Sequence, residues 1–108
     1  MNWTDYFFNL VYLVAMKSKD MSTHVGAIIV DSKKRIISCG YNGFPRNIKD
    51  SDLPWTKHGD FLSTKYPYVC HAEMNSILNS LKDVRGCTLY TTLFPCNECA
   101  KLIIQSGI

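Results

Sequence analysis

The sequence predicts a single α/β domain built on a mixed β-sheet, and three features of the chain lead to this prediction. A stripe of apolar residues at helical spacing opens the chain, a continuous apolar run follows it, and two further helical segments then alternate with a strand-like segment. Helices that alternate with strands are typical of α/β folds. A chain of 108 residues has room for one domain only, so we assign residues 1–108 to it.

The first helix is expected to run from about residue 3 to Met16. Asn2 or Thr4 can cap its start through a side-chain oxygen. Its apolar stripe consists of Trp3, Phe7, Leu10, Val11 and Val14. We interpret this stripe as core packing and not as a ligand site.

The next segment predicts a β-hairpin. Residues 25–30 form a short continuous apolar run, which is typical of a strand buried on both faces. A polar turn at residues 31–35 leads to the antiparallel partner strand, Ile36 to Tyr41. Asn42 follows that strand, where its side-chain amide could hold a sugar hydroxyl or serve as an ordinary turn residue.

Residues 44–68 show no clean periodicity, and prolines 45, 54 and 67 interrupt them. Loops longer than about 15 residues in compact domains are usually functional or disordered. The aromatic residues in this segment argue against disorder, so we expect a lid or an oligomer contact.

The last part of the chain predicts a strand between two helices. A helix is expected from His71 to Leu81, a strand from Cys87 to Leu93, and a second helix over residues 97–105 that stops at Gly107. A strand–helix–strand unit of this kind is expected to form a parallel pair with a right-handed crossover.

His71, Cys96 and Cys99 predict a catalytic zinc site at the starts of these two helices. Zinc prefers nitrogen and sulfur ligands, and two thiolates with one neutral imidazole balance its charge. Three protein ligands leave a fourth position for water, whose pKa zinc lowers from about 16 to about 7. Cys-x-x-Cys alone also occurs in structural zinc sites and redox motifs, and a lone His at a helix start is often a cap.

Glu73 is the expected catalytic residue beside this metal. A carboxylate in that position can take a proton from the water and pass it to a ring nitrogen and then to a leaving amine. The four residues together favour a catalytic site over each of the simpler interpretations.

Composition excludes several classes of function. The net charge of +3 and the lack of a basic stripe argue against nucleic-acid binding. No apolar run approaches the roughly 20 residues of a membrane span, and no signal peptide is recognised. We expect the remaining cysteines, Cys39, Cys70 and Cys87, to be reduced and buried, which indicates a cytoplasmic protein.

Several motifs resemble the zinc-dependent cytidine and deoxycytidylate deaminase family, and its deoxycytidylate branch most closely. They are YPYVCHAEMN at residues 66–75, TLFPCNECAK at residues 92–101, GYNG at residues 40–43 and SKD at residues 18–20. The resemblance covers nearly the whole chain. It implies a three-layer sandwich with helices on both faces of the sheet.

The resemblance also implies an activity, the zinc-dependent hydrolysis of dCMP to dUMP and ammonia, which supplies dUMP for thymidylate synthesis. In this assignment His71, Cys96 and Cys99 hold Zn²⁺, Glu73 moves protons, and Asn42 touches the deoxyribose of the substrate. Members of the family are commonly hexamers that dCTP and dTTP regulate together with Mg²⁺. The alternatives are a deaminase of another base, such as cytidine or tRNA adenosine, and an inactive zinc-binding fragment with a structural role.

The sequence departs from the family in one respect, because the family continues beyond the second metal helix with further strands and a helix. We therefore expect that the C-terminal strands of the family are absent from residues 1–108. The strand at residues 87–93 would then be an open sheet edge. Lys65, Lys82 and Arg46 are candidates for a phosphate-binding residue, although each is expected to be a solvated surface charge.

Overall fold

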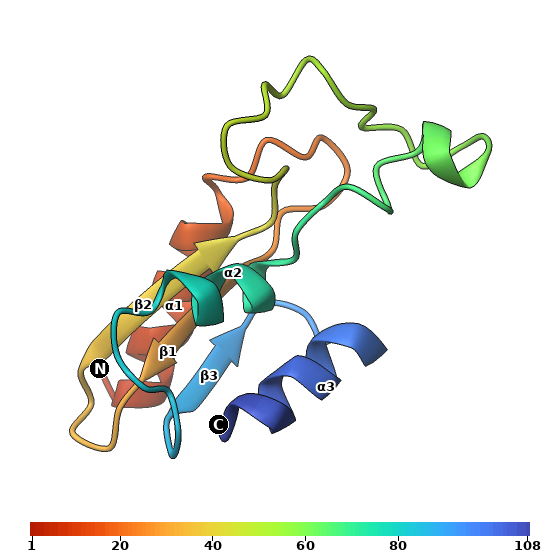
Figure 1. Ribbon diagram of the computed structural model, residues 1–108. Coiled ribbons are helices and arrows are strands. Elements are labelled where there is room, and N and C mark those ends of the chain that lie inside the picture. The colour runs from red at the N-terminus through yellow and green to blue at the C-terminus, as the bar shows by residue number, and fades with distance from the viewer.

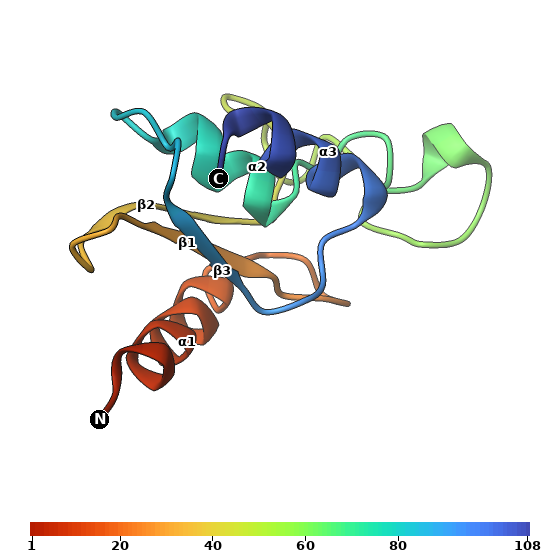
Figure 2. The ribbon, with the colours of Figure 1, turned by 90° about the horizontal axis from the view of Figure 1, so that it is seen from below.

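The computed structural model describes all residues, 1–108, as a three-stranded sheet between helices (Figure 1). In chain order the elements are α1 (Trp3–Ala15), β1 (Gly26–Val30), β2 (Ile36–Tyr41), the 3₁₀ helix η1 (Phe61–Ser63), α2 (Ala72–Asn79), β3 (Thr88–Thr91) and α3 (Asn97–Ser106). Helix α1 covers one face of the sheet, and α2 and α3 lie on the other (Figure 2). The predicted α/β class and the helices on both faces are therefore confirmed.

The sheet has the strand order β2-β1-β3, and both neighbouring pairs are antiparallel. Strands β2 and β3 consequently run in the same direction, but β1 lies between them. The prediction that the strand–helix–strand unit makes a parallel hydrogen-bonded pair is wrong for this reason. The most apolar strand takes the central position, because both of its faces are covered there. Strand β3 lies at the edge of the sheet, as the sequence predicted for these residues.

The core lies between α1 and the sheet. All five residues of β1 are buried. Phe7 and Val11 of α1 form one buried cluster with Ile28 and Val30 of β1. The ring of Tyr90 in β3 packs 5.1 Å from that of Phe7, centroid to centroid. Asn2 caps α1 by accepting the backbone N–H of Asp5, so the first of the two predicted caps is the one used.

Two glycines let the helices approach the sheet closely. A Cβ atom at Gly26 would lie 2.4 Å from the carbonyl oxygen of Val11 in α1. A Cβ atom at Gly40 would lie 2.4 Å from the backbone nitrogen of Ser76 in α2. Gly40 thus serves the close contact with the backbone of α2. Helix α2 is thus set against β2 at a fixed distance.

The segment between β2 and α2 arches away from the sheet and carries η1 (Figure 1). The ring of Trp55 packs on that of Phe44 with 4.1 Å between centroids, and its indole N–H donates to the carbonyl of Asp50. The backbone N–H of Lys65 donates to the carbonyl of Thr56 at 3.0 Å. The aromatic residues therefore give this loop a defined path, and its role as a lid or an oligomer contact stays a prediction.

The structure bears on two further expectations from composition. All five cysteines are free, but Cys39 is exposed and Cys70 and Cys87 are only half-buried, so the prediction that these three are buried is wrong. Cys39 lies in the edge strand β2, in which Gly40 is the one buried residue, so its side chain is left facing solvent. The longest helix has 13 residues, and no helix combines the length and the apolar character needed to cross a bilayer.

Candidate metal and active site

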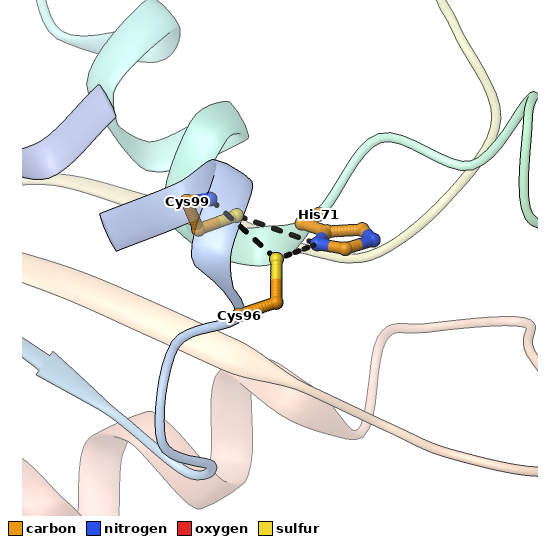
Figure 3. A group of neighbouring side chains, drawn as sticks. All are labelled: His71, Cys96 and Cys99. Atoms are coloured by element: carbon orange, nitrogen blue, oxygen red, sulfur yellow. Dashed lines mark hydrogen bonds between the residues drawn. The ribbon is translucent and has the colours of Figure 1, made fainter. Parts of the chain in front are cut away.

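The starts of α2 and α3 meet beside the C-terminal end of β3 and bring three metal-binding side chains together (Figure 3). His71 is the N-cap residue of α2 and Cys96 is the N-cap residue of α3. Cys99 lies in the first turn of α3. Side chains in the first turn lean toward the helix N-terminus, so both helices aim their donors at the space where the two starts converge.

The geometry of the three donors fits zinc. The Sγ atoms of Cys96 and Cys99 each lie 3.3 Å from Nδ1 of His71, and all three donor atoms are within 4.8 Å of one another. Around a tetrahedral zinc ion with ordinary bond lengths, a sulfur and a nitrogen ligand are separated by about 3.6 Å. Two soft sulfur donors and one imidazole also match zinc chemically. A zinc ion could therefore occupy this cluster with little movement of the three side chains.

The surroundings of the two thiols differ. Cys99 is 4% exposed. Burial raises the pKa of the Cys99 thiol, and the neighbouring Glu73 and Cys96 raise it further. Cys96 is exposed, and its sulfur accepts the backbone N–H of Cys99 at 3.5 Å. His71 is exposed as well, so a metal held by the three would be open to solvent on one side.

Glu73 lies in the first turn of α2 and points inward. The residue is 4% exposed, and its Oε1 atom accepts a hydrogen bond of 3.0 Å from the hydroxyl of Thr91 at the end of β3. Glu73 also lines the same cavity as His71 and Cys96. The carboxylate is therefore held beside the metal cluster, where the sequence placed it, and is not turned outward into bulk solvent.

A cavity of about 260 Å³ adjoins the metal cluster. His71, Cys96 and Glu73 line one part of it, and Asn42 and Val25 line another. Charged side chains from two segments far apart in the sequence complete the wall, namely Asp20, Lys57 and Lys65. The candidate catalytic residue and these charged side chains thus line the same cavity, which the sequence did not predict.

Asn42 is buried, and its amide is engaged with the segment that precedes β1. Its Oδ1 accepts the backbone N–H of Val25 at 2.9 Å, and its Nδ2 donates to the carbonyl of Thr23 at 3.0 Å. It is therefore more than a turn residue, because it fixes one wall of the cavity. One amide hydrogen and the second lone pair of the oxygen are left for a ligand.

Lys65 corrects one expectation. It was predicted to be a solvated surface charge, but it is 6% exposed and forms a buried ion pair with Asp20, which is 1% exposed. Burial by itself raises the pKa of Asp20, but hydrogen bonds from Lys65 and from the backbone of Ser22 and Thr23 outweigh it and hold that pKa below its ordinary value. The pair ties the segment before α2 to the segment before β1.

The other two phosphate candidates lie elsewhere. Arg46 donates to Oδ1 of Asn79 at 2.8 Å and lines a different pocket, and Lys82 is exposed beyond the C-terminal end of α2. Neither of them lines the cavity beside the metal cluster.

Sequence reasoning missed Thr91, Asp20 and Lys57. The alternation of side chains along β3 was a usable signal for Thr91. Tyr90 packs against α1, so its neighbour must face the opposite side, where the metal lies. Asp20 and Lys65 are separated by 45 residues, and no local pattern pairs them.

Comparison with known proteins places the chain in a family. The model of the cytidine and deoxycytidylate deaminase zinc-binding region matches residues 1–108, so the chain belongs to that zinc-binding deaminase family.

Among individual proteins, the chain is 53% identical over 110 residues to human deoxycytidylate deaminase, covering 100% of this chain and 62% of that protein. It is 56% identical over 115 residues to a probable deoxycytidylate deaminase of Drosophila melanogaster, covering 100% of this chain and 57% of the relative. The chain thus spans less than two thirds of the length of these relatives.

A solved structure with a similar fold is that of dCMP deaminase from the cyanophage S-TIM5 in complex with dCMP and dUMP. It superposes with a TM-score of 0.80 at 29% identity, over 97% of this chain and 75% of that one. The three-layer deaminase-like arrangement that the sequence predicted is confirmed by this likeness.

Proposed function

We propose that this chain forms the catalytic zinc site of a deaminase that hydrolyses dCMP to dUMP and ammonia. One observation carries the proposal: a His/Cys/Cys cluster and a buried glutamate line the same cavity. The names of the relatives and the dCMP and dUMP bound to the cyanophage enzyme supply the choice of substrate. Because the chain spans about 62% of the human relative, the activity of the whole protein is part of the proposal.

In this proposal each residue has a distinct task. His71, Cys96 and Cys99 would hold zinc, and the ion would supply a water acidic enough to act as a nucleophile near neutral pH. Glu73 takes one proton from the water and delivers it to N3 of cytosine, and it then takes the second proton from the hydroxyl added at C4 and passes it to the departing amine. Water adds at C4, the C4–N4 bond breaks, and the products are dUMP and ammonia. Thr91 holds the Glu73 carboxylate in place through its hydroxyl.

Asn42 is proposed to contact the deoxyribose. Its position in the cavity wall and its unused amide hydrogen support this role. Assembly into hexamers, regulation by dCTP and dTTP with Mg²⁺, and a cytoplasmic location remain predictions from the family resemblance.

The test is the variant Glu73→Ala. We expect zinc content and thermal unfolding close to those of the parent protein and a loss of dUMP formation of at least about a hundredfold, the lower range for a lost acid–base group. Glu98→Ala is the matched control, because Glu98 is an exposed glutamate in α3 whose only charged partner is Lys101. Equal dUMP formation by the parent and the Glu73→Ala protein would contradict the role of Glu73, and no dUMP formation by either protein would favour the structural zinc-binding alternative.

The substrate is tested separately by offering dCMP, cytidine and adenosine to the zinc-loaded protein. Deamination of dCMP is expected. Deamination of cytidine or adenosine with dCMP untouched would contradict the substrate assignment and leave the zinc site intact.

A further inference from the structure

The charged side chains that line the cavity leave one positive charge without a partner. Apart from the metal ligands, four charged side chains line it: Asp20, Lys57, Lys65 and Glu73. Glu73 faces the metal cluster and is assigned to proton transfer. The remaining three are two lysines and one carboxylate, which leaves one positive charge in this part of the wall.

Lys65 is not the source of that charge. It is buried and paired with Asp20, whose Oδ1 also accepts the backbone N–H groups of Ser22 and Thr23. A ligand anion would have to compete with a buried carboxylate for Lys65, and breaking a buried ion pair is costly. The Asp20–Lys65 pair therefore acts as a neutral part of the wall.

Lys57 is the unbalanced cation. Its side chain is exposed, and none of the ion pairs in the chain includes it. The other cations that the sequence suggested for a phosphate lie outside this cavity.

The backbone around Lys57 is anchored on its N-terminal side. Trp55 packs on Phe44, and the carbonyl of Thr56 accepts the N–H of Lys65, which the ion pair holds in the cavity wall. Lys57 directly follows these anchored residues. Its flexible four-carbon side chain therefore extends from an anchored backbone position in the wall of the cavity.

We propose that Lys57 binds the phosphate of the nucleotide substrate and so makes the site select a nucleoside monophosphate over the nucleoside. This inference rests on the proposed function and extends it to a residue that recognises the substrate. A lysine ammonium is a point charge with three donors, which suits a phosphate monoester. Because Lys57 is exposed, no carboxylate competes for its ammonium. The substrate can then bind with its base toward the metal cluster and its phosphate toward the solvent.

The experiment measures dissociation constants for dCMP and for deoxycytidine by titration calorimetry on zinc-loaded protein. All proteins carry Glu73→Gln so that neither ligand is consumed. Lys57→Met is compared with Lys57→Arg, which keeps the charge, and with Lys49→Met. Lys49 is the matched control because it is an exposed lysine of the same loop that does not line the cavity.

In Lys57→Met we expect the dissociation constant for dCMP to rise about tenfold, the effect of losing one charge-assisted hydrogen bond. The constant for deoxycytidine should stay the same. Lys57→Arg should restore dCMP binding to within about threefold, since a guanidinium keeps the charge and the donors. The advantage of dCMP over deoxycytidine in the parent protein should fall as salt is raised.

Three results would overturn the inference. If Lys57→Met weakens the binding of dCMP and of deoxycytidine equally, the residue shapes the cavity and does not bind the phosphate. If the parent protein binds both ligands equally well, the site does not recognise phosphate, although the proposed deaminase function survives. If the parent protein binds neither ligand, the proposed substrate and this inference fall together.

Discussion

At the scale of single residues, the hydrogen bond between Thr91 and Glu73 determines how well the proposed proton carrier is oriented. The Thr91 hydroxyl lies 3.0 Å from Oε1 of Glu73, a residue that is only 4% exposed. A hydrogen bond to a charged and buried group stabilises it by about 1.5–3 kcal/mol. Thr91 stands at the last position of β3, so a rigid strand end holds the carboxylate of α2.

Replacement of Thr91 by Val tests this orientation. Thr91→Val keeps the shape of the side chain and removes the donor, so we expect dCMP turnover to fall about tenfold with zinc content unchanged. Steady-state dUMP formation and metal analysis on the same preparation measure the two quantities. Thr88→Val is the control, because Thr88 is an exposed residue of the same strand away from Glu73. Unchanged turnover in Thr91→Val would show that Glu73 needs no support from β3.

At the scale of elements, the position of α2 depends on Gly40. The backbone of α2 approaches β2 so closely that a Cβ atom at Gly40 would lie 2.4 Å from the nitrogen of Ser76 and 2.7 Å from the carbonyl oxygen of Ala72. These are backbone atoms and cannot rotate away. Because α2 carries Glu73 and begins at His71, a shift of this helix would move two parts of the site at once.

We therefore expect Gly40→Ala to lower the free energy of unfolding by about 1–3 kcal/mol and to weaken zinc binding. Gly43→Ala is the matched control, since nothing lies within 4 Å of the Cβ position there. Chemical denaturation and zinc titration measure both effects. Equal stability of the two variants would mean that α2 can move away from the sheet without cost.

The Asp20–Lys65 ion pair joins two segments and predicts a pH dependence of stability. The pKa of the Asp20 carboxyl is lower in the folded protein than its ordinary value of 3.8. Its stabilising contribution is therefore complete above about pH 4, the ordinary range for such a group, and is lost as the pH falls through the folded-state pKa.

Asp20→Asn should remove this contribution. At pH 7 we expect its free energy of unfolding to be about 3 kcal/mol lower than that of the parent, because Lys65 is left buried without its partner. The difference should shrink on acidification toward pH 2. Asp50→Asn breaks the exposed Lys19–Asp50 pair and should leave the unfolding free energy unchanged. A constant difference between parent and Asp20→Asn across this pH range would contradict the assignment.

At the scale of the whole molecule, the two faces of the sheet are held by different means. Helix α1 buries Phe7, Val11 and Ala15 against the sheet, whereas Cys99 is the only buried residue of α3. Helix α3 packs against α2, and its C-terminal Gly107 accepts the backbone N–H of Gly86. A metal bridging His71 with Cys96 and Cys99 at the start of α3 would therefore provide much of the attachment of this helix.

Removal of zinc should accordingly loosen α3 before the rest of the fold. We expect amide hydrogen exchange in α3 to accelerate at least about tenfold when a chelator is added, while α1 and β1 change little. Exchange measured by mass spectrometry, with zinc added back as the control, resolves the elements separately. Equal loss of protection in α1 and α3 would show that the metal stabilises the fold as one unit.

The sequence by itself determined the elements and the metal-binding residues, because both are encoded locally. Apolar spacing predicted α1 and the buried strand β1, Asn2 and Gly107 marked helix ends, and the spacing of His71, Cys96 and Cys99 predicted the cluster that the structure assembles. Glu73 was placed beside it because it lies in the first turn of α2, next to the N-cap His71, and side chains there lean toward the helix start.

Only the tertiary structure decided which distant residues share the cavity. The burial of Lys65 against Asp20, the support of Glu73 by Thr91 and the place of β1 between β2 and β3 depend on contacts between segments far apart in the chain. From sequence alone a charged residue is predicted to be solvated, because the free energy of burying it depends on a partner that the sequence does not identify. Local spacing therefore predicted the chemistry of the site, and long-range packing determined the charges that surround it.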